Sequence, residues 1–234
     1  PWAISITVPH NTAVLVTSAD GQRVIEGPCV DLLEYEEVLA PMTLSTGTPK
    51  TDARTIRTCF LRTVGNRVSD RIRLETADFV TIDAKVSYHV TFDPQHRQSW
   101  FNHENYVELL CDHLRSLVRG RARGLPLTSL WPQLSEVIRD IILGEKTDEG
   151  RAGRLFAENG MRVTEVEVLS GEILDPEIAQ LLETVQRESV ALLIGDQQAR
   201  EKLRSRKLRH ELDKERLALD QEAQHGQSQL EALR

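Results

Sequence analysis

Few aromatic residues occur in the 234-residue sequence, which holds three Trp, three Tyr and five Phe. An aromatic share of 5% is low for a sugar-binding cleft or for a platform on which single-stranded nucleic acid stacks. A surplus of positive charge is also absent, because 36 Asp and Glu residues outnumber 29 Lys and Arg residues and give a net charge of −7. We therefore expect no general attraction to nucleic acid or to an anionic membrane surface.

Cysteine is scarce as well, with Cys29, Cys59 and Cys111 widely spaced and odd in number. They form no Cys-x-x-Cys pair, so the pattern of a disulfide framework or of a zinc knuckle is missing. We predict reduced thiols and a cytoplasmic location. No apolar run approaches the roughly 18 residues that a membrane-spanning helix needs. Residues 2–4 already have the character of a strand, so we also expect a soluble chain without a signal peptide.

Sequence motifs of common enzyme and nucleotide sites are missing. The chain has no Gly-x-Ser-x-Gly, Gly-x-Gly-x-x-Gly, P-loop or His-Glu-x-x-His string. His96, His103 and His113 lie near Glu104 and Glu108, but His103 and His113 are not three or four residues apart on one helical face, and we interpret these histidines as surface residues. We predict a protein that is not an enzyme, with no catalytic, metal-binding or cofactor-binding residues.

The first fifty residues have the pattern of short strands joined by turns. Residues 4–8 alternate between apolar and polar, and Asp20-Gly21 is a strong hairpin signal because tight hairpin turns need residues that tolerate positive φ. Gly27-Pro28 interrupts the next strand. The pattern predicts a small antiparallel β module over residues 1–53.

Residues 54–174 combine long strands with helices. Every even position from 80 to 92 is apolar and every odd one polar, which predicts a strand with one buried and one wet face. We expect it to pair antiparallel with residues 68–75. A first helical stripe and then a second follow at 3.6-residue spacing. Their members are Val107, Leu110, Cys111, Leu114 and Val118, then Leu134, Val137, Ile138, Ile141 and Ile142.

The remaining elements complete an α+β fold. Gly144 is placed to end the second helix, a short helix is expected to end at Asn159-Gly160, and a strand over 162–169 follows. Pro176 stands where a long helix would begin. We therefore predict three parts: a β module (1–53), an αβ domain (54–174) and a long helix (175–234).

The segment from residue 187 onward differs in composition from the rest. It has no Pro and no aromatic residue, is rich in strong helix formers, and balances ten Lys and Arg against nine Asp and Glu. Its apolar stripe is thin, so we expect it to need neighbouring helices for stability. The predicted helix–helix contacts are Leu203, Leu208, Leu212 and Leu219. Six cations form a possible anion-binding patch, although a solvated helix face accounts for them better: Arg200, Lys202, Arg204, Arg206, Lys207 and Arg209.

Several strings in this order of elements resemble a known superfamily. Residues 57–193 resemble the stomatin/prohibitin/flotillin (SPFH or band 7) domain, and within that superfamily they are most similar to the shoulder region of the major vault protein family. The strings that carry the resemblance include Arg67-Val68-Ser69-Asp70, Glu75-Thr76-Ala77-Asp78, Trp100-Phe101-Asn102, Glu104-Asn105-Tyr106 and Cys111-Asp112-His113-Leu114-Arg115-Ser116.

The N-terminal β module is similar to a repeat of the same family. Val24-Ile25-Glu26-Gly27-Pro28 followed by Glu34-Tyr35-Glu36-Glu37 resembles the core of a vault repeat. The resemblance implies a structural protomer of a large hollow ribonucleoprotein-type shell. Such a protomer would assemble side by side in many copies through β-module edges and a C-terminal cap or coiled-coil helix, and the shell would enclose protein or RNA cargo.

Two other functions fit parts of the sequence. A peripheral membrane scaffold of the SPFH type would oligomerise on lipid, with residues 200–209 or the strand faces meeting the bilayer. A nucleic-acid-binding module would use the arginines at 119–123 together with residues 200–209, and the overall acidity of the chain makes this the weakest of the three hypotheses.

Overall fold

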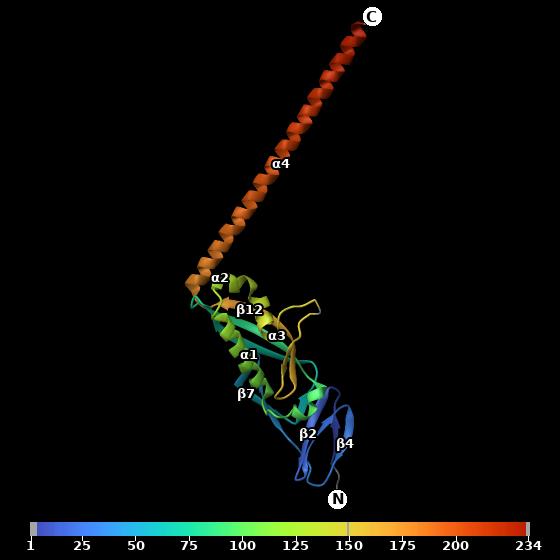
Figure 1. Cartoon of the computed structure of the whole chain (residues 1–234), viewed down its shortest axis with the longest axis vertical. Helices are drawn as coiled ribbons and strands as arrows, with labels where there is room; N and C mark the ends of the chain where they lie inside the picture. Colours follow the sequence, from blue (N-terminus) through green and yellow to red (C-terminus); the bar gives the residue numbers. More distant parts are fainter. Residues whose placement is uncertain (1–3, 149, 233–234) are drawn as a thin grey trace. The chain divides into compact units, whose positions relative to one another are not determined.

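The computed structural model describes residues 4–148 and 150–232, with the backbone alone at 51, 52, 211 and 213–232. The chain divides into two units, Pro1–Asp175 (unit 1) and Pro176–Arg234 (unit 2). Unit 1 holds all the strands and three short helices, and unit 2 is a single helix (Figure 1). Antiparallel sheets and separate helices make up an α+β fold, as the sequence predicts.

Short antiparallel strands form the N-terminal end of unit 1 (Figure 1). They are β1 (Ile4–Val8), β2 (Thr12–Ser18), β3 (Gly21–Glu26), β4 (Cys29–Leu33) and β5 (Val38–Leu39). β1 pairs with β4, and β2 pairs with both β3 and β5. Alternating apolar positions from these strands meet in one small core, made of Ile6, Val8, Val14, Val16 and Ile25.

Two glycines in this region occupy positions that other residues would strain. Gly21 closes the β2–β3 hairpin opposite Ser18 with φ of +151°, which confirms the expected Asp20-Gly21 turn. A Cβ on Gly27 would lie 2.1 Å from the carbonyl oxygen of Pro9. The backbone therefore passes too close to its neighbour for any side chain at position 27.

Three further strands lead from this region to the main sheet. β6 (Met42–Thr46) and β7 (Thr51–Thr58) form a two-stranded ribbon, and β8 (Phe60–Arg62) pairs with β2. The expected boundary between residues 53 and 54 falls inside β7. The division of the chain into three parts stays a prediction.

The main sheet has the strand order β11-β12-β10-β9. Its members are β9 (Asn66–Glu75), β10 (Thr81–Phe92), β11 (Arg154–Phe156) and β12 (Met161–Ile173). β9 and β10 pair antiparallel, which confirms the expected partner of the most regular strand. Even-numbered residues of β9 and β10 are buried on one face of the sheet, for example Ile72, Leu74 and Ile82.

Helices cover that apolar face (Figure 1). They are α1 (Tyr106–Ala122), α2 (Leu127–Leu130) and α3 (Leu134–Leu143), joined by the 3-10 turn η2 (Trp131–Gln133), with another 3-10 turn, η1 (Pro94–Ser99), after β10. α1 lies against β9 and α3 against β12. All five residues of the expected first stripe are buried in α1. Gly144 ends α3 with φ of +88°, as expected.

Two expectations for unit 1 are wrong. The odd-numbered face of β10 is not wet throughout, because Asp83 and Ser87 are buried. Arginine side chains from β9 reach over both residues, Arg71 to Asp83 and Arg67 to Ser87. The short helix expected before residue 159 is instead β11 and a turn, because the segment gains a pairing partner in β12 that local periodicity does not reveal.

Unit 2 is the helix α4 (Pro176–Ala232), 57 residues long. Its first residue is Pro176, which suits the first turn because the missing backbone N–H has no helical partner there. Most side chains described in it are exposed. The sequence predicted a long helix beginning at this proline, and the structure confirms it.

Candidate interaction surfaces

The leucines of α4 lie exposed on the helix. Leu203, Leu208 and Leu212 are 57%, 59% and 54% exposed, while the side chain of Leu219 lies outside the described part of the chain. Large apolar side chains that remain this exposed on a long helix are available for contact with other helices. Their role as helix–helix contacts stays a prediction.

Helix geometry divides these leucines between two faces. At about 100° per residue, Leu203 and Leu208 point about 140° apart, whereas Leu208 and Leu212 point about 40° apart. Leu203 instead shares a face with Val185, which is five full turns earlier. A neighbouring helix that contacts Leu208 and Leu212 therefore cannot use Leu203 in the same stripe.

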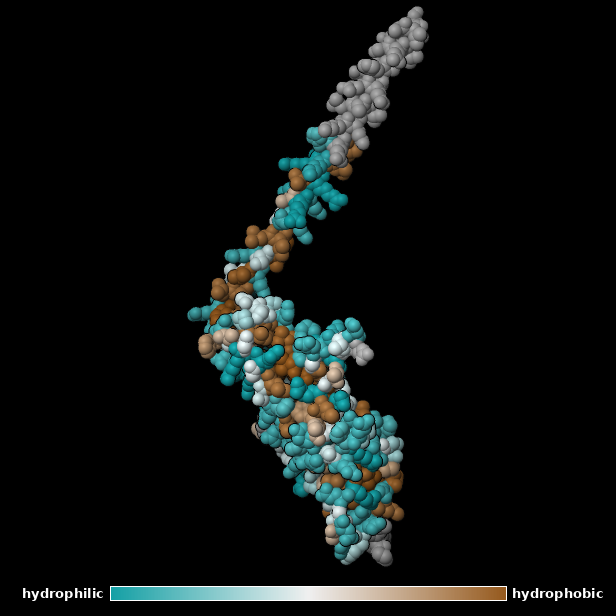
Figure 2. Space-filling view, in the orientation of Figure 1, coloured by the Kyte–Doolittle hydropathy of each residue, from teal (hydrophilic) through white to brown (hydrophobic). Residues whose placement is uncertain are grey.

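The basic segment of α4 forms two strips and not one patch. Each strip has the spacing i, i+4, i+7, and the two strips lie on well-separated faces of the helix. One strip is Arg200, Arg204 and Lys207, and the other is Lys202, Arg206 and Arg209. Arg200 is already paired with Asp196 at 2.8 Å. Figure 2 shows this hydrophilic stretch interrupting the apolar groups along the helix.

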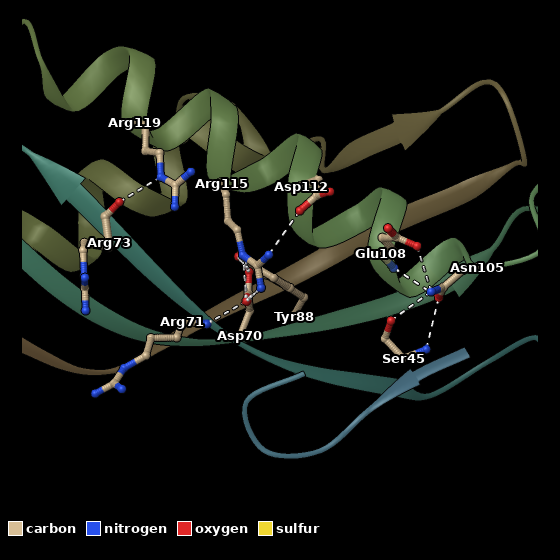
Figure 3. A network of polar contacts seen from close by, with 10 residues as sticks. All are labelled: Ser45, Asp70, Arg71, Arg73, Tyr88, Asn105, Glu108, Asp112, Arg115 and Arg119. Carbon is tan, nitrogen blue, oxygen red and sulfur yellow. Dashed lines mark hydrogen bonds and ion pairs between the residues drawn. The ribbon is translucent and has the colours of Figure 1, made fainter. Parts of the chain in front are cut away.

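An asparagine joins the β6–β7 ribbon to the first turn of α1 (Figure 3). Asn105 is the N-cap of α1, where its Oδ1 accepts from the backbone N–H of Glu108 at 3.3 Å. The same oxygen accepts from the backbone N–H of Ser45 at 3.1 Å, and Asn105 Nδ2 donates to Ser45 Oγ at 2.8 Å. One side chain thus fixes two segments that lie 60 positions apart in the sequence.

A buried ion pair fixes α1 to the sheet (Figure 3). The side chain of Asp70 on β9 is fully buried on the apolar face of the sheet, and its Oδ1 accepts a hydrogen bond from Arg115 Nη2 at 2.6 Å. Arg115 Nε, the backbone N–H of Arg71 and the hydroxyl of Tyr88 also donate to the carboxylate. Burial raises the pKa of Tyr88. Burial opposes the charge of Arg115, but its bonds to Asp70 raise its pKa on balance.

A hollow of about 790 Å³ lies beside the N-terminal half of α1. Its lining includes His103, Glu104, Glu108, Asp112 and His113. Among residues 4–148 and 150–232, no three His, Cys, Asp or Glu side chains are arranged to hold a metal ion. The imidazoles and carboxylates therefore share a surface without converging on one point.

The cysteines are free thiols in the structure. Cys111 is on the buried face of α1, and burial raises the pKa of its thiol. Cys29 and Cys59 are partly exposed. Within the described residues, no helix is both long and apolar enough to cross a membrane.

Comparison with known proteins divides unit 1 between β8 and β9. A family model described as the Major Vault Protein Repeat domain matches residues 3–62, and one described as the Shoulder domain matches residues 64–175. The chain carries a major vault protein repeat domain and a shoulder domain. β1 to β8 make up the repeat domain, and the main sheet with α1, α2 and α3 makes up the shoulder domain.

Curated proteins that are similar to this chain are named major vault protein. The chain is 28% identical over 251 aligned positions to the major vault protein of Bos taurus and 26% identical to that of Homo sapiens, in both cases covering 97% of this chain. It is 25% identical to major vault protein beta of Dictyostelium discoideum over 98% of the chain. The chain spans 28% of the length of each of these relatives.

Sequence reasoning did not identify the buried ion pair of Asp70 and Arg115 or the helix cap at Asn105 as structural contacts. Asn105 and Ser45 are one of several polar links between the repeat domain and the shoulder domain, and the ion pair of Asp70 and Arg115 joins α1 to the sheet within the shoulder domain. A signal for the pair exists, because Asp70 is an acidic residue on the apolar face of its strand. Arg115 lies one turn after Cys111, beside the buried stripe of α1.

Proposed function

We propose that the chain is part of a structural protomer of a hollow vault-like shell that assembles from many side-by-side copies. The observation that carries the proposal is the order of its parts: a vault repeat domain, a shoulder domain and then a long exposed helix. Enclosed protein or RNA would be cargo, and the protomer would act in the cytoplasm without catalysing a reaction. Wider membership of the SPFH superfamily is part of the same proposal.

The exposed apolar groups of α4 support self-assembly. A helix of 57 residues with thin, separated stripes gains little stability alone in water. Neighbouring copies would bury Leu208 and Leu212 on one face and Leu203 on another, so that each helix has two neighbours. A ring of parallel helices meets that requirement, because every copy offers one face to each side.

Electron microscopy of the full-length protein is the direct test. We expect hollow, ribbed particles, and a field of dispersed monomers would refute the structural proposal. In the same assay, Leu208→Glu combined with Leu212→Glu should abolish large particles while circular dichroism shows an intact β-rich unit. Lys202→Glu is the matched control, because it changes the net charge by the same two units at a position about 100° from both the Leu208 and Leu212 face and the Leu203 face. Full-size particles from the double variant would refute the proposal that these two leucines contact neighbouring helices.

The cationic strips of α4 favour one alternative, a peripheral membrane scaffold. Lys202, Arg206 and Arg209 lie on one exposed helix face, which suits contact with anionic headgroups. Flotation of the full-length protein with vesicles containing phosphatidylserine discriminates between the two functions. Strong binding that fails in high salt would favour the membrane scaffold.

A further inference from the structure

The outer face of the shoulder sheet, opposite the helices, carries opposite charges at its two edges. We call Arg67, Arg71 and Arg73 on β9 the basic flank, and Glu165, Glu167 and Glu172 on β12 the acidic flank. In the strand order β11-β12-β10-β9, β9 ends the sheet on one side. β12 pairs with β11 only up to Val163, so its remaining residues form most of the other edge. The basic flank and the acidic flank therefore lie at opposite edges of one sheet.

The strand register places the opposite charges in the same rows. Arg73, Asp83 and Glu172 lie side by side across β9, β10 and β12. Arg67, His89 and Glu165 form a second such row. Figure 3 shows the side chains of Arg71 and Arg73 directed away from α1, onto this outer face. A second copy placed beside the first, with no shift along the strands, would bring Arg73 level with Glu172 and Arg67 level with Glu165.

Part of this charge is already neutralised within one copy. Arg71 pairs with buried Asp83 at 2.7 Å, and Arg67 pairs with Glu167. In the part of the chain that the structure describes, Arg73 and Glu172 have no ion-pair partner, and both are exposed. These two residues are the opposite ends of one row, so their charges are available to a neighbour.

The backbone edge of β9 is closed to strand addition. The carbonyl oxygen of Ser69 accepts from the N–H of Lys50 at 2.9 Å, and that of Arg73 accepts from Arg119 Nε at 2.9 Å. The N–H of Arg71 donates to Asp70 Oδ1 at 2.7 Å. Blocked edges of this kind prevent sheets from merging. Contact at this flank must therefore run through side chains.

We propose that the basic flank of one copy binds the acidic flank of the next copy, head to tail, with Arg73 of one facing Glu172 of the other. The inference rests on the proposed function and names the contact within the shoulder domain. Because the two surfaces differ, the contact is heterologous and repeats around a ring.

Charge reversal in the complete chain tests the proposal. Sedimentation velocity over a concentration series at low salt should show self-association that weakens as salt rises. Arg73→Glu and Glu172→Arg should each weaken it about three- to tenfold, because each turns an attraction into a repulsion. The double variant should regain wild-type association, since both flanks are then reversed. Arg121→Glu on the exposed side of α1 is the matched control.

Cross-linking tests the same geometry directly. In a background of Cys29→Ser and Cys59→Ser, copies with Arg73→Cys mixed with copies with Glu172→Cys should form a disulfide-linked dimer under mild oxidation. Either variant alone should not.

A wild-type chain that is monomeric across the series, a double variant no better than the single ones, or equal cross-linking by one variant alone would overturn the proposal. Ribbed particles seen by microscopy together with any of these results would overturn this contact while leaving the structural function in place.

Discussion

The buried ion pair between α1 and the sheet gives the sharpest stability prediction. Replacing Arg115 by Met keeps most of the side-chain volume but leaves the carboxylate of Asp70 buried without its cation. Breaking a buried pair by removing one partner costs about 3–5 kcal/mol, because the remaining charge stays desolvated. Two donors to Asp70 remain, the backbone N–H of Arg71 and the hydroxyl of Tyr88, so we expect the lower end, about 3 kcal/mol.

Thermal unfolding followed by circular dichroism measures this loss. For a unit of 175 residues such as unit 1, each kcal/mol of lost stability lowers Tm by about 2–4 °C, so Arg115→Met should lower Tm by about 6–12 °C. Arg121→Met, an exposed position on the same helix, is the control and should stay within about 0.5 kcal/mol of wild type. Asp70→Asn combined with Arg115→Met should cost clearly less than the two single changes added together. Additive effects, or an Arg115 variant as stable as the control, would refute the argument.

Three further predictions follow from other contacts. Asn105→Ala should cost about 1–2 kcal/mol and speed amide exchange in both β6 and the first turn of α1; exchange faster in only one of them would contradict the linking role. Cys111 should resist alkylation in the native protein while the two partly exposed cysteines react, as mass spectrometry of the labelled peptides would show; equal labelling of all three would contradict its burial. The hydrogen bond from Arg23 lowers the pKa of Glu37 to about 2. This pair therefore stabilises the fold above the ordinary glutamate pKa, and its contribution is lost as pH falls from about 4.5 to about 2. An NMR titration of Glu37 should show the low midpoint, and Arg23→Gln should raise that midpoint.

Much of unit 1 could be read from local periodicity. The alternation over residues 80–92 gave β10, the 3.6-residue stripe around Leu110 gave α1, and Asp20-Gly21 gave the first hairpin. The segment before Asn159 was the failure, because three residues of β11 are too few to establish a period. Its pairing with β12 decides its structure.

The candidate surfaces were less accessible to sequence reasoning. The leucines of α4 could be found by their spacing, but a continuous helix was needed to show that Leu203 and Leu208 face different directions. The basic and acidic flanks could not be found at all. Arg73 and Glu172 are almost a hundred positions apart, and only the register of three strands puts them in one row.

The amino-acid sequence by itself determined the kinds of element, their order and the change to a long helix at Pro176, because each depends on interactions between residues a few positions apart. The tertiary structure alone decided that Asp70 is buried beneath Arg115, that Asn105 joins two domains and that the sheet has oppositely charged edges. These features depend on contacts between residues 45 to 100 positions apart. Such contacts form only once packing of the apolar face has fixed which strand lies next to which and in what register.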